Sequence, residues 1–186
     1  MSANPNSLRL FLSELAKRPK LVGAIWPSSP ALGRAMARRL PEHQAELVLE
    51  LGPGTGIVTE ELLAAGLPQE RLVAVEKSER LAGFLRERYP NARVITGDAL
   101  EIDRDLAGIK FGAVISSLPL KLFPPKDVAR LAEAIHNVLA PGADWVQFSY
   151  QIVNGRVPGK TFRRVATEIV WQNFPPAKVS VYRRSV

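Results

Sequence analysis

A glycine-rich segment between an apolar run and an amphipathic run carries the clearest chemical signal in the sequence. It reads Glu50-Leu51-Gly52-Pro53-Gly54-Thr55-Gly56. Because glycine has no β-carbon, a ligand can approach the backbone of Gly52, Gly54 and Gly56 at a turn that follows a strand. Ile57 occupies the third glycine position of the dinucleotide pattern G-x-G-x-x-G, and no P-loop Lys-Ser/Thr pair follows. We therefore predict a cofactor other than a nicotinamide dinucleotide, with Glu50 placed to hydrogen-bond its amino acid moiety or a bridging water.

Two more acids follow the next two apolar runs. Glu76 lies 20 residues beyond Gly56, where a carboxylate of a doubly wound fold can accept both ribose hydroxyls of a nucleoside. Asp98 can accept a hydrogen bond from an adenine amino group, with Ala99 against the ring. Ligands of such folds bind at the carboxyl ends of the strands. Three acids at consecutive strand ends therefore predict a nucleoside-containing cofactor at one sheet edge.

Short β-branched runs alternate with amphipathic stretches over the middle of the chain, and these elements must position the acids and glycines. The rhythm predicts a parallel sheet with helices on both faces. Proline and glycine at 66, 68, 90, 141 and 142 mark helix ends. Strands are predicted at 46–51, 72–75, 92–95, 111–116 and 145–153, a closing antiparallel pair at 165–171 and 178–182, and helices at 58–65, 79–89 and 128–139.

Composition narrows the chemistry further. The 186 residues suffice for one domain whose core needs neither metal nor disulfide. Cysteine is absent and there are two histidines, so thiolate catalysis and Cys-ligated zinc are excluded and no metal is expected. No secretory signal opens the chain, and no run of about 18 apolar residues is present to span a membrane. We expect a cytoplasmic protein, free or peripherally bound to a membrane.

Basic residues are segregated to the two ends of the chain. Residues 1–40 and residues 155–186 each carry seven Lys or Arg against one acid, so the net charge of +7 leaves residues 41–154 at −5. The ends can form a solvated basic surface, or they can meet an anionic partner, either phospholipid or nucleic acid.

The N-terminal 25 residues have the pattern of an amphipathic helix. At about 100° per residue, four apolar side chains share one stripe. The stripe holds Leu8, Phe11, Leu12 and Leu15, and the basic residues beside it are Arg9, Lys17, Arg18 and Lys20. Such a helix can pack on its own domain, or its apolar face can enter a bilayer while its cations meet anionic headgroups.

Together these segments resemble the class I S-adenosylmethionine methyltransferases and, within them, the bacterial phospholipid N-methyltransferases that convert phosphatidylethanolamine to phosphatidylcholine, relatives of the ribosomal RNA adenine dimethylases. The resemblance extends over nearly the whole chain and rests on segments 5–25, 23–29, 50–56, 75–77, 97–99 and 116–120. It implies a doubly wound, seven-stranded, Rossmann-like α/β methyltransferase fold with a C-terminal antiparallel strand pair and an N-terminal amphipathic helix. Residues 1–186 would form one domain, with 1–28 binding the membrane and covering the cofactor, S-adenosyl-L-methionine.

The segment Ser117-Leu118-Pro119-Leu120 separates the two related families. In adenine dimethylases the matching motif is Asn-Leu-Pro followed by an aromatic residue whose ring stacks on the target base. Leu120 stands at the position of that ring, so the site is expected to lack the main stacking platform, which is worth about 1–3 kcal/mol. The sequence also ends without the helical RNA-binding domain of those enzymes. We therefore expect no nucleic acid partner and a small lipid amine as substrate.

The resemblance implies roles for individual residues. Cofactor binding falls to Ser28, Glu50, Gly52, Gly54, Gly56, Glu76, Lys77, Asp98 and Ala99, and the reacting amine meets Ser117, Leu118 and Pro119. Substrate and membrane contacts are expected from Arg9, Phe11, Leu12, Lys17, Arg18, Lys20, Leu120, Arg163 and Arg164, with Tyr150 and Tyr182 as further headgroup candidates. The two C-terminal arginines are placed there because guanidinium pairs bidentately with phosphate. His136 lies in a predicted helix and is not expected to act as a base.

Three functions remain open at this point. The leading one is N-methylation of phosphatidylethanolamine and its mono- and dimethyl derivatives at the inner leaflet of the cell membrane, with no obligate protein partner. The mechanism would be in-line attack of a neutral amine on the sulfonium methyl, accelerated by alignment. The second is RNA adenine N6-methylation, with the basic ends on a phosphate backbone. The third is a non-catalytic cofactor-fold module, against which the intact glycine loop and acids weigh.

Overall fold

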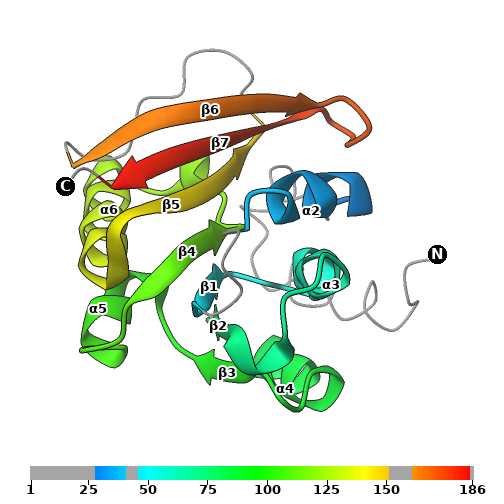
Figure 1. The fold of residues 1–186 in the computed structure, drawn as a ribbon, viewed down its shortest axis with the longest axis vertical. Coiled ribbons are helices and arrows are strands. Elements are labelled where there is room, and N and C mark those ends of the chain that lie inside the picture. Colours follow the sequence, from blue (N-terminus) through cyan, green and yellow to red (C-terminus); the bar gives the residue numbers. More distant parts are fainter. Residues whose placement is uncertain (1–27, 41–45, 151–160, 185–186) are drawn as a thin grey trace.

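One mixed sheet organises the part of the chain that the structure describes, a computed structural model of residues 28–40, 46–150 and 161–184. The strands are β1 (Val48–Leu51), β2 (Leu72–Glu76), β3 (Arg93–Thr96), β4 (Phe111–Ser116), β5 (Leu139–Ser149), β6 (Phe162–Val170) and β7 (Ala177–Arg184). They lie in the order β3-β2-β1-β4-β5-β7-β6 (Figure 1). β1 to β5 pair in parallel, whereas β7 runs antiparallel between β5 and β6.

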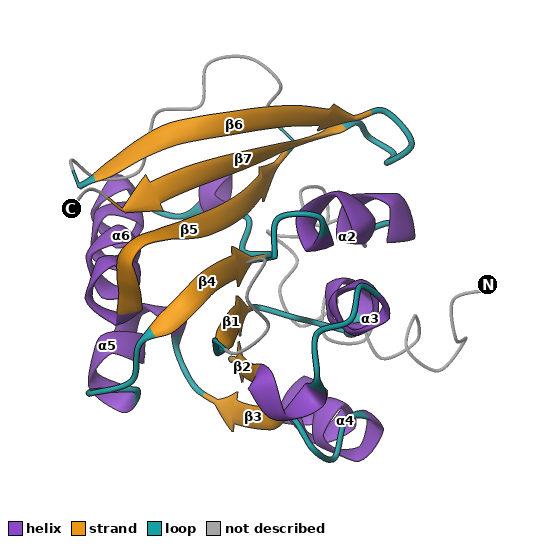
Figure 2. Cartoon of the chain, viewed as in Figure 1, coloured by secondary structure: helices purple, strands orange, loops and turns teal. Residues whose placement is uncertain are grey.

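Helices cover both faces of this sheet (Figure 2). On one face lie α2 (Pro30–Ala37), α3 (Ile57–Ala64) and α4 (Glu79–Arg88), and on the other α5 (Ile102–Asp105) and α6 (Pro125–Val138). Short 3-10 turns are η2 (Gln69–Arg71), η3 (Ala99–Glu101) and η4 (Leu120–Leu122). Successive strand residues point to opposite faces, so Val48 packs with the α2–α3 layer and Leu49 with the α6 layer. Both faces are therefore buried, as parallel strands require.

Local sequence sets where the helices nearest the glycine loop begin. The hydroxyl of Ser29 accepts a hydrogen bond from the backbone N–H of Leu32 at 3.2 Å, and Pro30 follows it in the first turn of α2. Ser78 caps α4 in the same way, accepting from the backbone N–H of Leu81 at 3.4 Å. Both helices thus start directly after segments that the sequence assigns to the cofactor.

The chain reverses direction across the sheet between β1 and β4. It passes from β1 to β2 and β3 on one side, then returns to form β4 and β5 on the other. The loops after β1 and β4 therefore diverge and leave a crevice at the carboxyl ends of the strands, where doubly wound proteins bind ligands. Backbone hydrogen bonds of 2.9 Å, from Gly52 N to Val75 O and from Ser117 N to Leu51 O, hold these loops at the sheet edge.

The expected seven-stranded doubly wound fold with a closing antiparallel pair is confirmed, with three local differences. β5 begins at Leu139 because Pro141 and Gly142, expected to close a helix, lie inside the strand at an irregularity in its pairing with β4. β6 begins at Phe162, three residues before the predicted start. α2 and α5 were not predicted; the four residues of α5 are too few to show helical periodicity. The predicted N-terminal helix lies outside the described residues.

Candidate active site

A cavity of about 460 Å³ opens at the carboxyl ends of β1, β2 and β4. The glycine loop forms its floor, the β2–α4 and β3–η3 connections form one wall, and the loop after β4 forms the opposite wall. Most of the residues assigned to the cofactor and to the reacting amine line it: Ser28, Gly52, Gly54, Glu76, Lys77, Asp98, Ala99, Ser117, Leu118 and Pro119. Segments separated by up to 91 positions in the chain, from Ser28 to Pro119, therefore meet at one place.

The glycine loop leaves room for a ligand where a side chain would otherwise stand. Gly54 has a φ of +60°, and no atom lies within 4 Å of the point where its β-carbon would be. Gly52 has a φ of +67°, and a β-carbon there would meet the side chain of Leu118 at 2.7 Å. A side chain at either position would require a strained backbone. At Gly54 it would enter the cavity, and at Gly52 it would displace Leu118 in the cavity wall. The loop thus forms a backbone cradle that suits the cofactor expected there.

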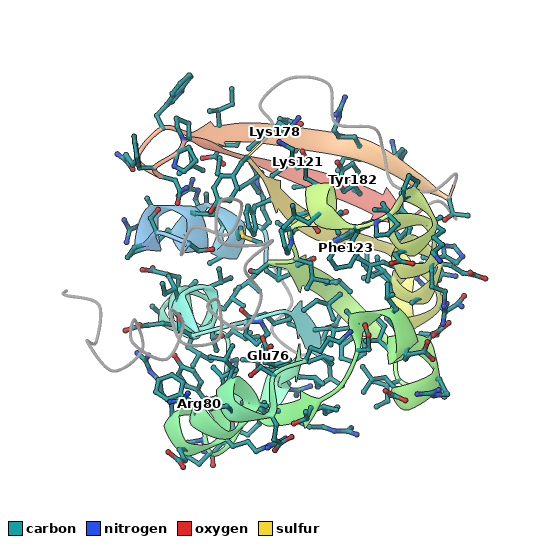
Figure 3. All side chains as sticks on the ribbon, turned by 180° about the vertical axis from the view of Figure 1, so that it is seen from behind. Glu76, Arg80, Lys121, Phe123, Lys178 and Tyr182 are labelled. Carbon is teal, nitrogen blue, oxygen red and sulfur yellow. The ribbon has the colours of Figure 1, made fainter. Side chains whose placement is uncertain are left out.

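Glu76 joins the glycine loop to the start of α4. One carboxylate oxygen accepts the backbone N–H of Gly54 at 3.1 Å, and the other accepts the backbone N–H of Ser78 at 2.9 Å. The residue is 8% exposed and lines the cavity. Because each carboxylate oxygen has about two acceptor sites, Glu76 can also accept two ribose hydroxyls. Figure 3 labels it on the α4 side of the sheet edge.

Asp98 and Lys77 form an ion pair at the adjoining wall, with 2.6 Å between Lys77 Nζ and one Asp98 oxygen. The other oxygen accepts the backbone N–H of Leu100 at 3.1 Å. Partial burial alone would raise the pKa of Asp98, but the hydrogen bonds from Lys77 and Leu100 outweigh it and the pKa is lowered. Asp98 is thus an ionised acceptor beside Ala99, in the position expected for recognition of an adenine amino group.

Glu50 occupies a different layer from the other acids. Its side chain is fully buried, is absent from the cavity lining and accepts a 2.7 Å hydrogen bond from the hydroxyl of Thr59 on α3. Burial raises the pKa of Glu50 to about 8; the Thr59 bond lowers it in part and the charge of Glu76 raises it. Its second oxygen has no hydrogen-bond partner among the described residues. Glu50 therefore supports the loop from behind, with no direct access to the cavity.

The loop after β4 forms the wall that faces the cofactor loop. Ser117, Leu118 and Pro119 all line the cavity. The carbonyl of Leu118 accepts a hydrogen bond from the side-chain amide of Gln147 at 2.9 Å, so β5 fixes its orientation. The hydroxyl of Ser117 is buried with no hydrogen-bond partner within the described part of the chain. A buried polar group without a partner is costly, which marks Ser117 as a point where a ligand can supply one.

Aromatic side chains line the cavity beyond this loop, contrary to the expectation from Leu120. Leu120 itself is absent from the lining, whereas Phe123, three residues further on, belongs to it together with Phe148 and Tyr150. The rings of Phe148 and Tyr150 meet edge to face with centroids 5.3 Å apart. Asp127, in the first turn of α6, adds a carboxylate to the same wall. Tyr150 was already a headgroup candidate from the sequence. Phe123 was missed because η4 turns the chain between positions 120 and 123.

Several candidate residues are not brought to the cavity. Arg163 and Arg164 lie at the start of β6, and Arg163 pairs with Arg183, which in turn pairs with Asp144 near the start of β5. They are therefore at the sheet edge opposite the cavity, which gives them no contact with its ligands. Tyr182 is buried in the core against Trp145, with ring centroids 5.4 Å apart. His136 packs edge-on against Phe162 and is not part of the cavity lining. The membrane residues 9–20 lie outside the described ranges.

The strand order, the glycine turn after β1 and the acids after β2 and β3 define a class I methyltransferase architecture. A family model described as a methyltransferase domain matches residues 48–142 of the 186. The chain therefore belongs to the methyltransferases, and its cofactor is S-adenosyl-L-methionine. In the cavity, Glu76 and Asp98 are acceptors that would fit its ribose hydroxyls and its adenine amino group, and the open backbone at Gly54 leaves room for its amino acid moiety.

Two relatives give the family context. The chain is 32% identical to the ornithine lipid N-methyltransferase of Singulisphaera acidiphila over 178 residues, which cover 90% of this chain and 91% of that protein. It is also 32% identical to the ribosomal RNA small subunit methyltransferase A of Chlorobium phaeobacteroides over 114 residues, which cover 61% of this chain but 41% of that protein. Similarity to the lipid enzyme thus extends over nearly the full length of both chains.

Solved structures share the fold. TrmN from Thermus thermophilus superimposes with a TM-score of 0.70 at 19% identity, covering 83% of this chain and 48% of TrmN. The N-methyltransferase NodS from Bradyrhizobium japonicum, in complex with S-adenosyl-L-homocysteine, has a TM-score of 0.65 at 16% identity, covering 84% of this chain and 88% of NodS. At these identities the likeness concerns the fold alone.

Proposed function

We propose that this protein methylates the amine of a membrane lipid headgroup, with phosphatidylethanolamine and its mono- and dimethyl derivatives as substrates. The observation that carries the proposal is the cavity wall beyond Pro119, where Phe123, Phe148 and Tyr150 stand together with Asp127. Aromatic faces and a carboxylate are the groups that recognise alkylammonium ions. The full-length similarity to an ornithine lipid N-methyltransferase supports a lipid as the carrier of that amine.

Each part of the wall has a task in the transfer. S-adenosyl-L-methionine supplies an electrophilic methyl group when it is bound. Asp127 attracts the headgroup ammonium, which must lose one proton to water before its lone pair can attack, while the backbone carbonyls of Ser117 and Leu118 can accept hydrogen bonds from its remaining N–H groups. The new N–C bond forms as the bond between methyl carbon and sulfur breaks, and the product is a methylated ammonium. Leu118 and Pro119 keep the nitrogen in line, so the rate gain comes from alignment.

A membrane lipid as substrate requires the enzyme to work at a membrane surface. We propose that the protein works at the cytoplasmic leaflet as a peripheral enzyme, with the basic residues Arg9, Lys17, Arg18 and Lys20 attracted to anionic lipid. Within the described residues no helix is both long and apolar enough to cross a membrane.

The test is methyl transfer from labelled S-adenosyl-L-methionine to three acceptors: phosphatidylethanolamine in mixed micelles, ornithine lipid in the same micelles, and unmethylated ribosomal RNA. We expect labelled mono-, di- and trimethylated phosphatidylethanolamine. Asp127→Asn should reduce this transfer and leave cofactor binding unchanged, whereas the matched control Glu133→Gln, whose carboxylate is exposed on the same helix, should reduce neither. Labelling of ornithine lipid alone would correct the headgroup and keep the lipid class.

The second candidate function is RNA adenine N6-methylation. The similarity to a ribosomal RNA methyltransferase favours it, and so do the three rings in the cavity, because base stacking on aromatic side chains is sequence-tolerant. The chain spans 41% of the length of that relative. Labelling of ribosomal RNA without labelling of either lipid would overturn the lipid proposal in favour of this one.

A further inference from the structure

Two large aromatic side chains are exposed in the turn that joins β6 to β7. Trp171 is 71% exposed and Phe174 is 78% exposed, the highest values among the large hydrophobic residues that the structure describes. Aromatic side chains gain much of their stabilising energy from burial, so two neighbouring ones left in water point to a surface that meets something apolar.

The residue between them shows that this turn has a defined structure. Asn173 is 1% exposed. Its side-chain oxygen accepts the backbone N–H of Ser29 at 3.0 Å, and its side-chain amide donates to the carbonyl of Pro175 at 2.7 Å. The inward side chain of Asn173 therefore fixes the turn against the start of α2. Trp171 and Phe174, on either side of it, are held outward.

The turn lies at the same sheet edge as the cavity. β6 and β7 end their pairing at Val170 and Ala177, one position beyond the pairing of Ser149 with Lys178 at the end of β5. Tyr150, the next residue of the chain, lines the cavity and is hydrogen-bonded to Asn173. In Figure 1 the turn lies at the right-hand end of β6 and β7, above α2. A bonded path thus runs from the exposed aromatic pair to the cavity wall.

We propose that Trp171 and Phe174 insert into the interfacial region of a phospholipid bilayer and set the mouth of the cavity at the level of the headgroups. The choice of a lipid surface rests on the proposed function, because a headgroup can reach the cavity while its acyl chains stay in the bilayer only if this edge faces the membrane. Trp suits that interface, since its ring is apolar and its N–H can meet water.

Lysines with exposed side chains lie near the cavity, which is itself lined by the carboxylates of Glu76, Asp98 and Asp127. Lys77 lines the cavity with its side chain 61% exposed. Lys121 and Lys126 are exposed on either side of the lining segment that contains Phe123. An anionic leaflet attracts cations near its surface. Lys77 is paired with Asp98, so the cations that favour the same orientation as the aromatic turn are Lys121 and Lys126. This contact is separate from the one proposed for residues 9–20.

The first experiment compares Trp171→Ala/Phe174→Ala with Val165→Ala, which removes an exposed apolar side chain near the other end of β6. Binding is measured by co-sedimentation with vesicles of equal parts phosphatidylglycerol and phosphatidylethanolamine. We expect the double variant to bind about tenfold more weakly or worse, in line with the apolar area withdrawn from the interface, with unchanged melting temperature and cofactor affinity. Val165→Ala should match the wild type. Equal vesicle binding by all three proteins would overturn the inference.

The second experiment observes insertion directly. In a Trp26→Phe variant the remaining tryptophans are Trp145, which is fully buried, and Trp171. Adding the same vesicles should shift the emission to the blue and protect it from iodide, because Trp171 leaves water. Unchanged emission on a vesicle-bound protein would overturn the inference. A second result would also overturn it: a wild-type dimer in size-exclusion chromatography, together with a monomeric double variant that binds vesicles as well as the wild type. The aromatic pair would then join two copies of this chain.

Activity separates this inference from the proposed function. The double variant should methylate phosphatidylethanolamine in vesicles poorly but should match the wild type on a short-chain phosphatidylethanolamine dissolved as monomers. A wild-type protein that binds vesicles through the turn but methylates no lipid would refute the proposed function and leave the turn as a membrane contact. Full activity of the double variant on vesicles would refute the turn and leave the function standing.

Discussion

The two halves of the cavity are built in different ways. The half that holds the cofactor comes from the ends of three adjacent parallel strands, and its contacts, such as Glu76 with Gly54 and Asp98 with Lys77, join residues within about 20 positions of one another. The half that faces the substrate gathers Leu118 and Phe123 from the segment after β4, and Phe148 and Tyr150 from the end of β5 and the residue after it. The first half is fixed by contacts between residues close in the sequence, whereas the second forms only when segments distant in the sequence have come together on the sheet.

Backbone geometry should therefore dominate the first half, and the largest effect is expected at Gly54. A leucine there would enter the cavity in the space that the cofactor needs. We expect Gly54→Leu to weaken S-adenosyl-L-methionine binding at least about a hundredfold, because overlap with a ligand in a packed site is not relieved by small shifts. Isothermal titration calorimetry measures the affinity.

Gly108→Leu is the matched control for this variant. Gly108 also has a positive φ, +82°, and open space at its β-carbon, but it is not part of the cavity lining. Both variants should lose similar stability from the left-handed backbone, about 1–2 kcal/mol. Only the Gly54 variant should lose the cofactor. Equal losses of binding would mean that strain, and not occupancy, explains the role of Gly54.

Glu50 should give the largest effect on stability in the cofactor half. Its folded-state pKa of about 8 lies above the ordinary value of 4.5, so the folded protein binds the proton more tightly than the unfolded chain does. The stabilising contribution is complete below pH 4.5 and is lost as the pH rises through about 8. The free energy of unfolding should fall between these values by up to about 1.4 kcal/mol per pH unit.

Glu50→Gln should remove most of this pH dependence, because the amide keeps the neutral form at every pH. Urea unfolding at pH 5, 7 and 9 measures the effect, and Glu133→Gln on the exposed face of α6 is the control. A wild-type protein whose stability rises from pH 5 to 7 would mean that Glu50 is ionised in the fold, and its place would then be with the ligand-contacting acids.

Glu76 should show a smaller effect, confined to binding. Glu76→Ala removes the acceptor for the ribose hydroxyls and releases the backbone N–H groups of Gly54 and Ser78. We expect S-adenosyl-L-methionine affinity to fall by about 1–2 kcal/mol, or roughly tenfold. Glu79→Ala, which removes an exposed acid from the start of α4, should leave it unchanged. Unaltered affinity in a folded Glu76→Ala protein would exclude Glu76 from the ribose site.

The same contrast explains which features could be predicted from the sequence. The glycine turn, Glu76 and Asp98 were identified because a strand end followed by a loop constrains where the next few residues lie. Glu50 was expected to hydrogen-bond the cofactor, whereas its side chain is buried outside the cavity lining; spacing does not tell which face of β1 it occupies. Phe123 was missed because η4 turns the chain after position 120, and Phe148 because its place depends on how β5 pairs with β4. Arg163 was expected to hold a phosphate, but the pairing of β5, β6 and β7 puts it at the sheet edge away from the cavity.

The substrate half should give the smallest effect, and one that depends on the substrate. Phe123 presents an aromatic face to the cavity, and attraction between such a face and a cation is worth about 0.5–2 kcal/mol. Each added methyl group also gains apolar contact, worth up to about 0.8 kcal/mol when buried. Phe123→Ala should therefore raise the KM by a factor that grows from phosphatidylethanolamine to its monomethyl and dimethyl derivatives, from about twofold to about tenfold.

Leu120→Ala, which changes a residue outside the lining, is the control and should raise none of the three KM values. An equal increase for all three substrates would mean that Phe123 packs the wall without contacting the amine, and the recognition of alkylammonium would then fall to Phe148 and Tyr150.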